Sequence, residues 1–269
     1  VTIYDGDDPA MPMWMVFNHN DSGTTMLGRG DVDATSVSAE NSILCIGSSG
    51  TSYGTLSIIN FVSEECTIDF ANAYTRTGGV VQRNNNGQKM YANGNPAIVN
   101  MHVNDIAMTV LPNAPIDSAT GLPIPTIAVA TAGGVSVIKD DGSVVDITGA
   151  AEVPSDVTFN DANQILTTGK YDQMIVVHDI ASVDTNVDTN YVRRYSYQES
   201  PNIDMPTDGV YATYGLVANK DDFYVARVKG VVLVKENIAD KASGSVAFVS
   251  KDYNTGYMVG DIKLAALSD

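Results

Sequence analysis

The segment that most constrains the fold is Pro125-Thr-Ile-Ala-Val-Ala-Thr-Ala-Gly-Gly-Val-Ser-Val-Ile-Lys-Asp-Asp-Gly-Ser-Val-Val-Asp-Ile-Thr148. Read with a period of two, it predicts three short strands, at 127–131, 135–139 and 143–147. They are joined by Gly133-Gly134 and Asp141-Gly142, dipeptides that accept the positive φ of two-residue hairpin turns and so set the register. The small, uncharged first strand suits burial on both faces, whereas the alternating third strand suits half exposure. A meander of this kind is the unit of a propeller blade.

The same meander pattern recurs along the chain. Equivalent first strands place Ile46, Val129, Thr167 and Val225 at like positions. Ile46 and Val129 lie 83 residues apart, which fits two units of about 40 to 50 residues, the length of known propeller blades. No segment has sustained helical periodicity. We therefore predict an all-β, β-propeller-like fold of about five to six small antiparallel blades, because a lone blade leaves apolar faces that only neighbouring blades cover. The alternative is a β-sandwich or a β-rich stalk.

The predicted propeller-like domain spans residues 1–269 and contains two irregular segments. The polar segment 18–41, rich in Asp, Ser, Gly and Thr, is expected to be an exposed loop. The segment 186–209 is expected to be an insertion. The apolar run Met11–Phe17 predicts a strand, and Trp14, the only tryptophan, is expected in the core.

Composition excludes several classes of partner. Fifteen Lys and Arg against thirty-two Asp and Glu give a net charge of −17, which opposes binding to nucleic acid or to an anionic membrane surface. No apolar run reaches the roughly eighteen residues of a membrane-spanning helix, so no membrane insertion is expected. The two cysteines, Cys45 and Cys66, lie in apolar strand-like runs and are expected to be buried thiols.

Two segments resemble large tail proteins of bacteriophages, particularly marine ones. They are Asp105-Ile-Ala-Met-Thr-Val-Leu with the following Gly121-Leu-Pro-Ile-Pro-Thr-Ile-Ala-Val-Ala-Thr-Ala-Gly-Gly-Val-Ser-Val-Ile, and Tyr253-Asn-Thr-Gly-Tyr-Met-Val-Gly-Asp-Ile-Lys-Leu-Ala-Ala-Leu-Ser-Asp. In that family a propeller-like region commonly precedes lectin-like or carbohydrate-binding modules. The resemblance implies a virion tail component that contacts other copies of itself and other tail proteins, as a trimer in a fibre or a hexamer in a tail tube. It brings no catalytic motif.

The best candidate for a ligand-contacting surface begins the insertion. Tyr191, Tyr195 and Tyr197 alternate on one face of a predicted outer strand, beside Arg193. Exposed aromatic rings that stack on sugars, flanked by polar groups, would suit a host cell-surface glycan, and inserted loops often carry function. The alternative is cross-strand packing of the aromatic side chains.

One segment has the spacing of a calcium loop. Asp184, Asn186 and Asp188 place oxygen ligands at alternate positions, as a hard cation requires. The segment lacks the Gly expected at the sixth position, which is Thr189, and the Glu expected at the twelfth, which is Tyr195. A polar turn leading into a strand explains the same residues without a Ca²⁺ ion, and no other cofactor is predicted.

No motif assigns a catalytic role. His19, His102 and His178 are isolated from any nucleophile signature. We therefore predict a non-enzymatic phage tail component, acting in virion assembly, host-surface attachment or both. The alternative is a virion-associated polysaccharide-degrading enzyme, a glycoside hydrolase or lyase, that uses paired carboxylates. A purely architectural role predicts that Met11–Phe17 and Tyr257-Met258-Val259 contact neighbouring subunits.

Overall fold

The structure is a computed structural model of the whole chain. It describes residues 1–18, 25–28, 32–69, 72–86, 88–149, 153–168, 174–186, 191–196, 203–204, 213–219, 222–227, 230–235, 245–250 and 262–266. The chain divides into two compact units. The first comprises Val1–Ile127 with Ile138–Val144, and the second comprises Ala128–Val137 with Val145–Asp269. The single domain expected over 1–269 stays a prediction.

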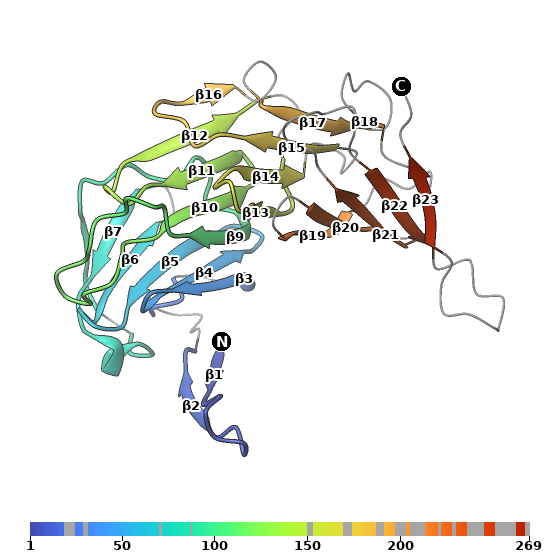
Figure 1. Cartoon of the computed structure of the whole chain (residues 1–269). Coiled ribbons are helices and arrows are strands. Elements are labelled where there is room, and N and C mark those ends of the chain that lie inside the picture. Colours follow the sequence, from blue (N-terminus) through green and yellow to red (C-terminus); the bar gives the residue numbers. More distant parts are fainter. Residues whose placement is uncertain are drawn as a thin grey trace. The chain divides into compact units, whose positions relative to one another are not determined.

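The strands of the described residues form five sheets, most of them meanders of consecutive strands (Figure 1). The first two sheets are a two-stranded sheet and a six-stranded sheet in the order β3-β4-β5-β6-β7-β8. Their strands are β1 (Thr2–Tyr4), β2 (Met13–Val16), β3 (Asp33–Glu40), β4 (Ile43–Ser49), β5 (Gly54–Asn60), β6 (Glu65–Asp69), β7 (Ala73–Arg76) and β8 (Met90–Ala92).

The other three sheets have five strands each, in the orders β16-β12-β11-β10-β9, β13-β14-β15-β17-β18 and β19-β20-β21-β22-β23. The short strands β16 and β18 pair in parallel with β12 and β17. The strands are β9 (Val103–Thr109), β10 (Thr126–Thr131), β11 (Gly134–Ile138), β12 (Val144–Thr148), β13 (Val157–Phe159), β14 (Ile165–Thr168), β15 (Met174–His178), β16 (Thr185–Asn186), β17 (Arg193–Ser196), β18 (Ile203–Asp204), β19 (Thr213–Asn219), β20 (Asp222–Arg227), β21 (Gly230–Lys235), β22 (Ser245–Ser250) and β23 (Ile262–Ala266).

The predicted all-β, propeller-like organisation is confirmed, since small meander sheets follow one another along the chain. Within the described ranges the one helix is the short 3₁₀ helix η1 (Val80–Gln82), and no α-helix occurs. The expected number of blades, about five to six, stays a prediction.

The strands expected around residues 127–147 form where predicted, each within one residue at either end. The first turn is displaced by one residue, because Gly134 already belongs to β11. The Thr131 hydroxyl explains this shift. It donates a hydrogen bond to the Gly134 carbonyl at 2.8 Å and accepts one from the Gly133 N–H at 3.1 Å, which closes the turn around Ala132 and Gly133.

The apolar core of the first unit gathers side chains from β4, β5 and β6 and from the segments before β3 and after β7. Its buried members are Phe17, Met26, Leu27, Leu44, Ile46, Ile59, Cys66, Ile68 and Val80. Val1, Ile3 and Met15 pack against this core from the β1–β2 hairpin and are partly buried there. Burial of these side chains stabilises the unit by removing apolar surface from water.

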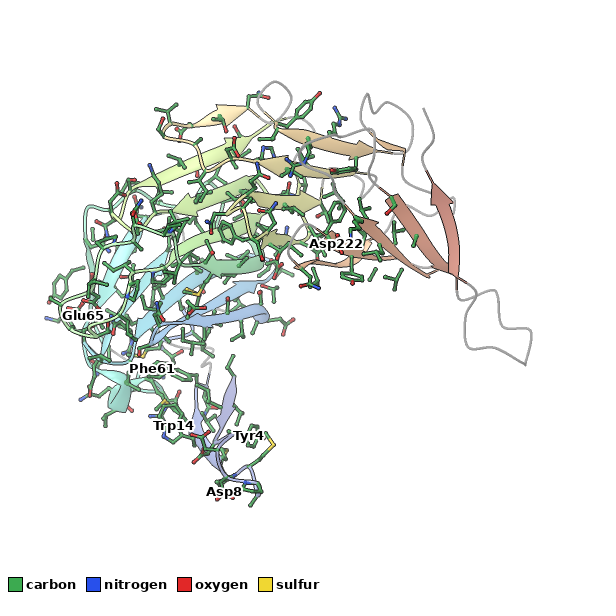
Figure 2. All side chains as sticks on the ribbon, viewed as in Figure 1. Tyr4, Asp8, Trp14, Phe61, Glu65 and Asp222 are labelled. Atoms are coloured by element: carbon green, nitrogen blue, oxygen red, sulfur yellow. The ribbon has the colours of Figure 1, made fainter. Side chains whose placement is uncertain are left out.

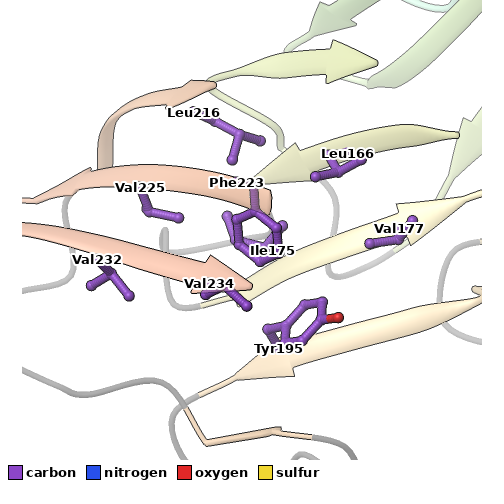
Figure 3. Close-up of a cluster of buried hydrophobic side chains, with 9 residues drawn as sticks. All are labelled: Leu166, Ile175, Val177, Tyr195, Leu216, Phe223, Val225, Val232 and Val234. Carbon is purple, nitrogen blue, oxygen red and sulfur yellow. The ribbon is translucent and has the colours of Figure 1, made fainter. Parts of the chain in front are cut away.

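The apolar core of the second unit lies between two sheets, one containing β14, β15 and β17 and the other containing β19, β20 and β21 (Figure 3). Its buried members are Leu166, Ile175, Val177, Tyr195, Leu216, Phe223, Val225, Val232 and Val234. Tyr195 and Phe223 meet edge to face, with ring centroids 5.1 Å apart. Face-to-face stacking of two twisted sheets therefore forms this core.

The loop expected over residues 18–41 is wrong for its second half, because β3 occupies Asp33–Glu40. This strand buries little of its own surface. It forms because its backbone pairs with β4 along its length, while the Thr35 hydroxyl donates to the Val103 carbonyl at 2.8 Å. A strand held by a buried neighbour needs no apolar alternation of its own, so the polar composition was misleading.

The insertion expected over residues 186–209 is also interrupted by regular structure. Arg193–Ser196 forms β17, which pairs with β15, and Ile203–Asp204 forms β18. The segment 191–196 is therefore part of a sheet whose register is set by β15, while most of the remaining insertion lies outside the described residues.

Candidate functional site

The β1–β2 hairpin of the first unit carries several exposed apolar side chains. We call its four large exposed side chains the hairpin patch: Tyr4 is 53% exposed, Met11 58%, Met13 62% and Trp14 60%. The patch results from the shortness of the hairpin. Ile3 and Met15 lie opposite each other and are partly buried against the core, whereas the other apolar residues of this short ribbon remain in water.

The base of the hairpin is held by polar and aromatic contacts within the unit. Arg83 Nε donates to the Val16 carbonyl at 2.6 Å, and Asn84 Nδ2 donates to the same oxygen at 3.0 Å. The Arg83 guanidinium also lies 5.7 Å from the centre of the Phe17 ring. These contacts fix the direction in which the hairpin leaves the core.

Aromatic contacts connect the hairpin patch to the core. The Trp14 ring lies 5.9 Å from the Phe61 ring, and Phe61 in turn meets the buried Phe17 ring edge to face at 6.4 Å (Figure 2). Trp14 is therefore oriented on one side by Phe61 while its other side faces solvent. The expectation that Trp14 lies in the core is wrong, because the irregular register of the β1–β2 hairpin leaves Trp14 without an opposite residue in β1 and its side chain is 60% exposed.

The tip of the hairpin is acidic and locally ordered. Asp5 Oδ1 accepts a hydrogen bond from the Asp7 N–H at 3.0 Å, and Asp8 Oδ1 accepts one from the Ala10 N–H at 2.8 Å. Such turns hold the backbone without burying the carboxylates, which remain exposed. The hairpin thus presents apolar side chains beside a negatively charged tip.

The residues expected to contact a glycan are not together on an exposed surface. Tyr195 is 2% exposed and belongs to the apolar core of the second unit, and Arg193 is 3% exposed. Tyr191 is half-buried, and Tyr197 lies outside the described residues. Tyr195 packs on Phe223 of the neighbouring sheet, because its place in the register with Ile175 turns the ring toward β20.

Arg193 instead belongs to a buried polar cluster at one end of the β13-β14-β15-β17 sheet. Its guanidinium donates to Gln164 Oε1 at 2.7 Å, and Gln164 Nε2 donates to Asp179 Oδ1 at 2.8 Å. Asn160, which is 6% exposed, donates to the same Gln164 oxygen at 3.3 Å. Gln164 therefore connects the buried cation to an exposed carboxylate, which offsets part of the cost of burying charge.

The calcium-like segment is described only in part. Asp184 and Asn186 are exposed, and Asp188 lies outside the described residues. Asp184 Oδ1 already accepts a hydrogen bond from the Asp146 N–H at 3.0 Å, and Asn186 lies in β16 opposite Thr148. Within the described ranges, no group of three or more His, Cys, Asp or Glu side chains could hold a metal ion. Calcium binding stays a prediction.

Asp146 is the carboxyl group of this region with a shifted pKa. Burial raises the pKa of Asp146 above its ordinary value, and the nearby Asp184 carboxylate raises it further. A hydrogen bond from the Ser136 hydroxyl to Asp146 Oδ1, at 2.6 Å, acts in the opposite direction. The arrangement brings two acids close together, one of which holds its proton to higher pH.

The remaining residues that the sequence singled out are the three histidines and the two cysteines. His178 is buried at the end of β15, His102 Nδ1 lies 3.2 Å from the Ser49 hydroxyl, and His19 lies outside the described residues. Both cysteines are free and buried, as expected. Burial raises the pKa of Cys45 and of Cys66 to about 12, so both thiols stay protonated and unreactive at neutral pH.

Comparison with known proteins finds similar solved structures but no similar sequence. No protein-family model and no curated protein matches the sequence. A streptogramin B lyase structure is 11% identical with a TM-score of 0.35, over 94% of this chain and 72% of that chain. A catalytically inactive virginiamycin B lyase from Staphylococcus aureus with quinupristin is 11% identical with a TM-score of 0.36, over 89% and 71%.

The WD40 domain of Neurospora crassa Pan2 is 8% identical to this chain, with a TM-score of 0.32, over 81% of this chain and 82% of that domain. At such low TM-scores these likenesses carry no argument about activity, ligands or partners. In the part of the chain that the structure describes, no helix is long and apolar enough to cross a membrane.

The sequence patterns therefore did not predict that the hairpin patch is exposed. The apolar run around Trp14 has the composition of a core strand, and composition alone does not say how many faces of a strand are covered. One feature of the sequence does indicate that this run is exposed. The run is preceded by the acidic, Gly- and Pro-containing turn 5–10 and by a strand of three residues, too little structure to cover two faces.

Proposed function

We propose that this protein is a non-enzymatic structural component of a bacteriophage tail, where it is held to other tail proteins through the hairpin patch. The observation that carries the proposal is the exposure of four large apolar side chains on one anchored hairpin. Apolar groups gathered in this way on a polar surface are typical of protein interaction sites. The tail location follows from the sequence resemblance, and attachment to a host cell-surface glycan remains part of the proposal.

The physical case for an interface is strongest at Trp14. Aromatic side chains dominate the binding energy of interfaces, particularly when a fixed scaffold presents them. Trp14 is held on one side by Phe61, so little of its conformational freedom remains to be lost on binding. The acidic tip at Asp5, Asp7 and Asp8 favours a partner with basic groups beside an apolar groove.

The location is tested on intact particles. Antibodies raised against the purified protein, detected by gold labelling in the electron microscope, should mark the tail. Gold that is absent from particles, or confined to the capsid, would overturn the proposed location.

The role of the hairpin patch is tested by incorporation into tails. Replacing Met13 and Trp14 by serine should remove most of the protein from purified tails, because the partner loses its apolar anchor. Val81→Ser is the matched control, since Val81 is 80% exposed and lies outside the hairpin. Equal incorporation of the double variant and the control would show that the hairpin patch is not the contact.

The alternative function, a polysaccharide-degrading enzyme of the virion, is favoured by one observation. Asp146, with its raised pKa, donates its backbone N–H to Asp184, and glycoside hydrolysis uses two carboxyl groups, one of which is a general acid with a raised pKa. The test is sugar release from host capsule or lipopolysaccharide by catalytic amounts of protein. Release that disappears in Asp146→Asn would support the enzyme, whereas saturable binding without products supports the non-enzymatic role.

A further inference from the structure

The sheet of β19, β20 and β21 has two faces of different character. The pairing register places Val217, Tyr224 and Leu233 side by side on one face, and Leu216, Val225 and Val232 side by side on the other. This follows from the strand period of two, because in-register partners point to the same side of a sheet.

One face is fully covered. Leu216, Phe223, Val225, Val232 and Val234 are at most 6% exposed and form the core of the second unit with residues of β14, β15 and β17 (Figure 3). On its buried side, this sheet therefore packs against a second antiparallel sheet.

The opposite face, which we call the outer face, is apolar as well and is partly exposed in β19, β20 and β21, whereas Ala247 of β22, in register with Leu233 on the same face, is buried. Val217 is 60% exposed, Tyr224 38% and Val231 40%, and Leu233 is half-buried between its neighbours. Solvent-facing strand positions ordinarily carry polar side chains. Four neighbouring apolar residues across three paired strands form a continuous patch that a sheet of the same kind would cover.

The outer face ends in a pair of opposite charges. Asp222 of β20 lies in register with Lys235 of β21, one step along the strands from the Tyr224 and Leu233 pair. The two charges cancel, so this face is locally neutral on a chain whose net charge is −17. Two copies therefore meet here with less electrostatic repulsion than elsewhere on an acidic surface.

We infer that the outer face binds the outer face of a second copy of this chain, through a two-fold axis that runs along the strands between β20 and β21. Such an axis places β20 of one copy over β21 of the other. Asp222 then faces Lys235 of the partner subunit twice, and Tyr224 packs on the partner's Leu233. A two-fold interface requires a surface that complements itself. The order of charges and apolar residues on this face meets that requirement.

The charge order is what selects a second copy over other partners. An unrelated apolar partner would bury Asp222 and Lys235 without opposite charges at matching positions, which costs free energy. With the two-fold axis, each charge of one copy meets its opposite on the other, and the apolar rows interdigitate as in stacked sheets. This inference goes beyond the proposed function and does not depend on it.

The test measures self-association of the purified full chain by analytical ultracentrifugation, from about 1 µM to about 1 mM. The wild-type protein should form a concentration-dependent dimer. Asp222→Lys alone, or Lys235→Asp alone, should weaken the dimer at least about tenfold, because each creates two like-charge contacts. An equimolar mixture of the two single variants should restore dimers, since lysine at position 222 of one then faces aspartate at position 235 of the other.

The mixture also controls for misfolding, because two unfolded variants do not rescue each other. Asp161→Lys, an exposed charge reversal in the turn between β13 and β14, should leave the dimer unchanged. Tyr224→Ser should weaken the dimer without altering charge. The inference would be overturned if the wild-type protein stayed monomeric throughout the concentration range, or if the dimer tolerated both charge reversals. Neither result bears on whether the protein is part of a phage tail.

Discussion

Strands β10 and β11 are buried on both faces, whereas β20 and β21 are buried on one face only. The two pairs also differ in side-chain size. In β10 the large Ile127 and Val129 alternate with the small Ala128 and Ala130, so one face leaves room for close packing. In β20 the buried Phe223 and Val225 alternate with Asp222, Tyr224 and Ala226. Apolar content alone therefore does not report whether a strand is covered, because the second face of β21 carries the apolar Val231 and Leu233 and is still partly exposed.

The largest expected effect separates the two faces of β20. Phe223→Ala should lower the free energy of unfolding by about 3–5 kcal/mol, since it leaves a cavity against Tyr195 in the core of the second unit. Tyr224→Ala, one residue further along, should change it by less than about 0.5 kcal/mol at low protein concentration. Urea unfolding followed by circular dichroism measures both. Equal losses would mean that the outer face is covered in solution.

An intermediate effect tests the two-sided burial of β10. Ala130→Leu should destabilise by about 1–3 kcal/mol, because Ala130 has no exposed surface and added methylene groups must displace packed neighbours. Ala226→Leu, on the outer face of the β19–β21 sheet, is the matched control and should be nearly neutral. Thermal unfolding of the dilute proteins compares them. A tolerated leucine at 130 would show that β10 has space on one side.

Sequence patterns predicted the meander around residues 127–147 to within one residue because two signals agreed there. Alternation marks the strands, and Gly142, with φ of +81°, marks a turn that other residues adopt less readily. The strand at 33–40 was missed because its stability comes from β4 and not from its own side chains. Local patterns predict elements whose stability is local, and they miss those formed by a partner.

The candidate sites were harder to predict, since they depend on which face of a strand is covered. The alternation of Tyr191, Tyr195 and Tyr197 indicated correctly that a strand was present, but the same period fits a row facing solvent and a row facing the core. Tyr195 proved to face the core because β17 pairs with β15 in one register, and a shift of one residue would have turned it outward. Trp14 shows the opposite outcome, because it lies at the irregular point of the β1–β2 register and is 60% exposed.

The smallest expected effect concerns Asp146 in β12, the partly exposed strand of the sheet that contains β10. Because burial and the Asp184 carboxylate raise its folded-state pKa above the ordinary value of 3.8, the folded protein holds this proton to higher pH than the unfolded chain does. Stability contributed by the group is therefore fully present below pH 3.8 and is lost as pH rises through the folded-state pKa.

Asp146→Asn should remove that pH dependence and raise the melting temperature slightly at neutral pH, provided that the amide keeps the Ser136 hydrogen bond. Asp141→Asn gives the opposite sign, since the Ser143 hydroxyl holds the pKa of Asp141 below its usual range and its ionised form is the stabilising one. Melting temperatures across acidic to neutral pH measure both variants. A loss of stability at neutral pH in Asp146→Asn as large as in Asp141→Asn would mean that Asp146 is stabilised as a carboxylate, and that its side of β12 is open to water, unlike β10 of the same sheet.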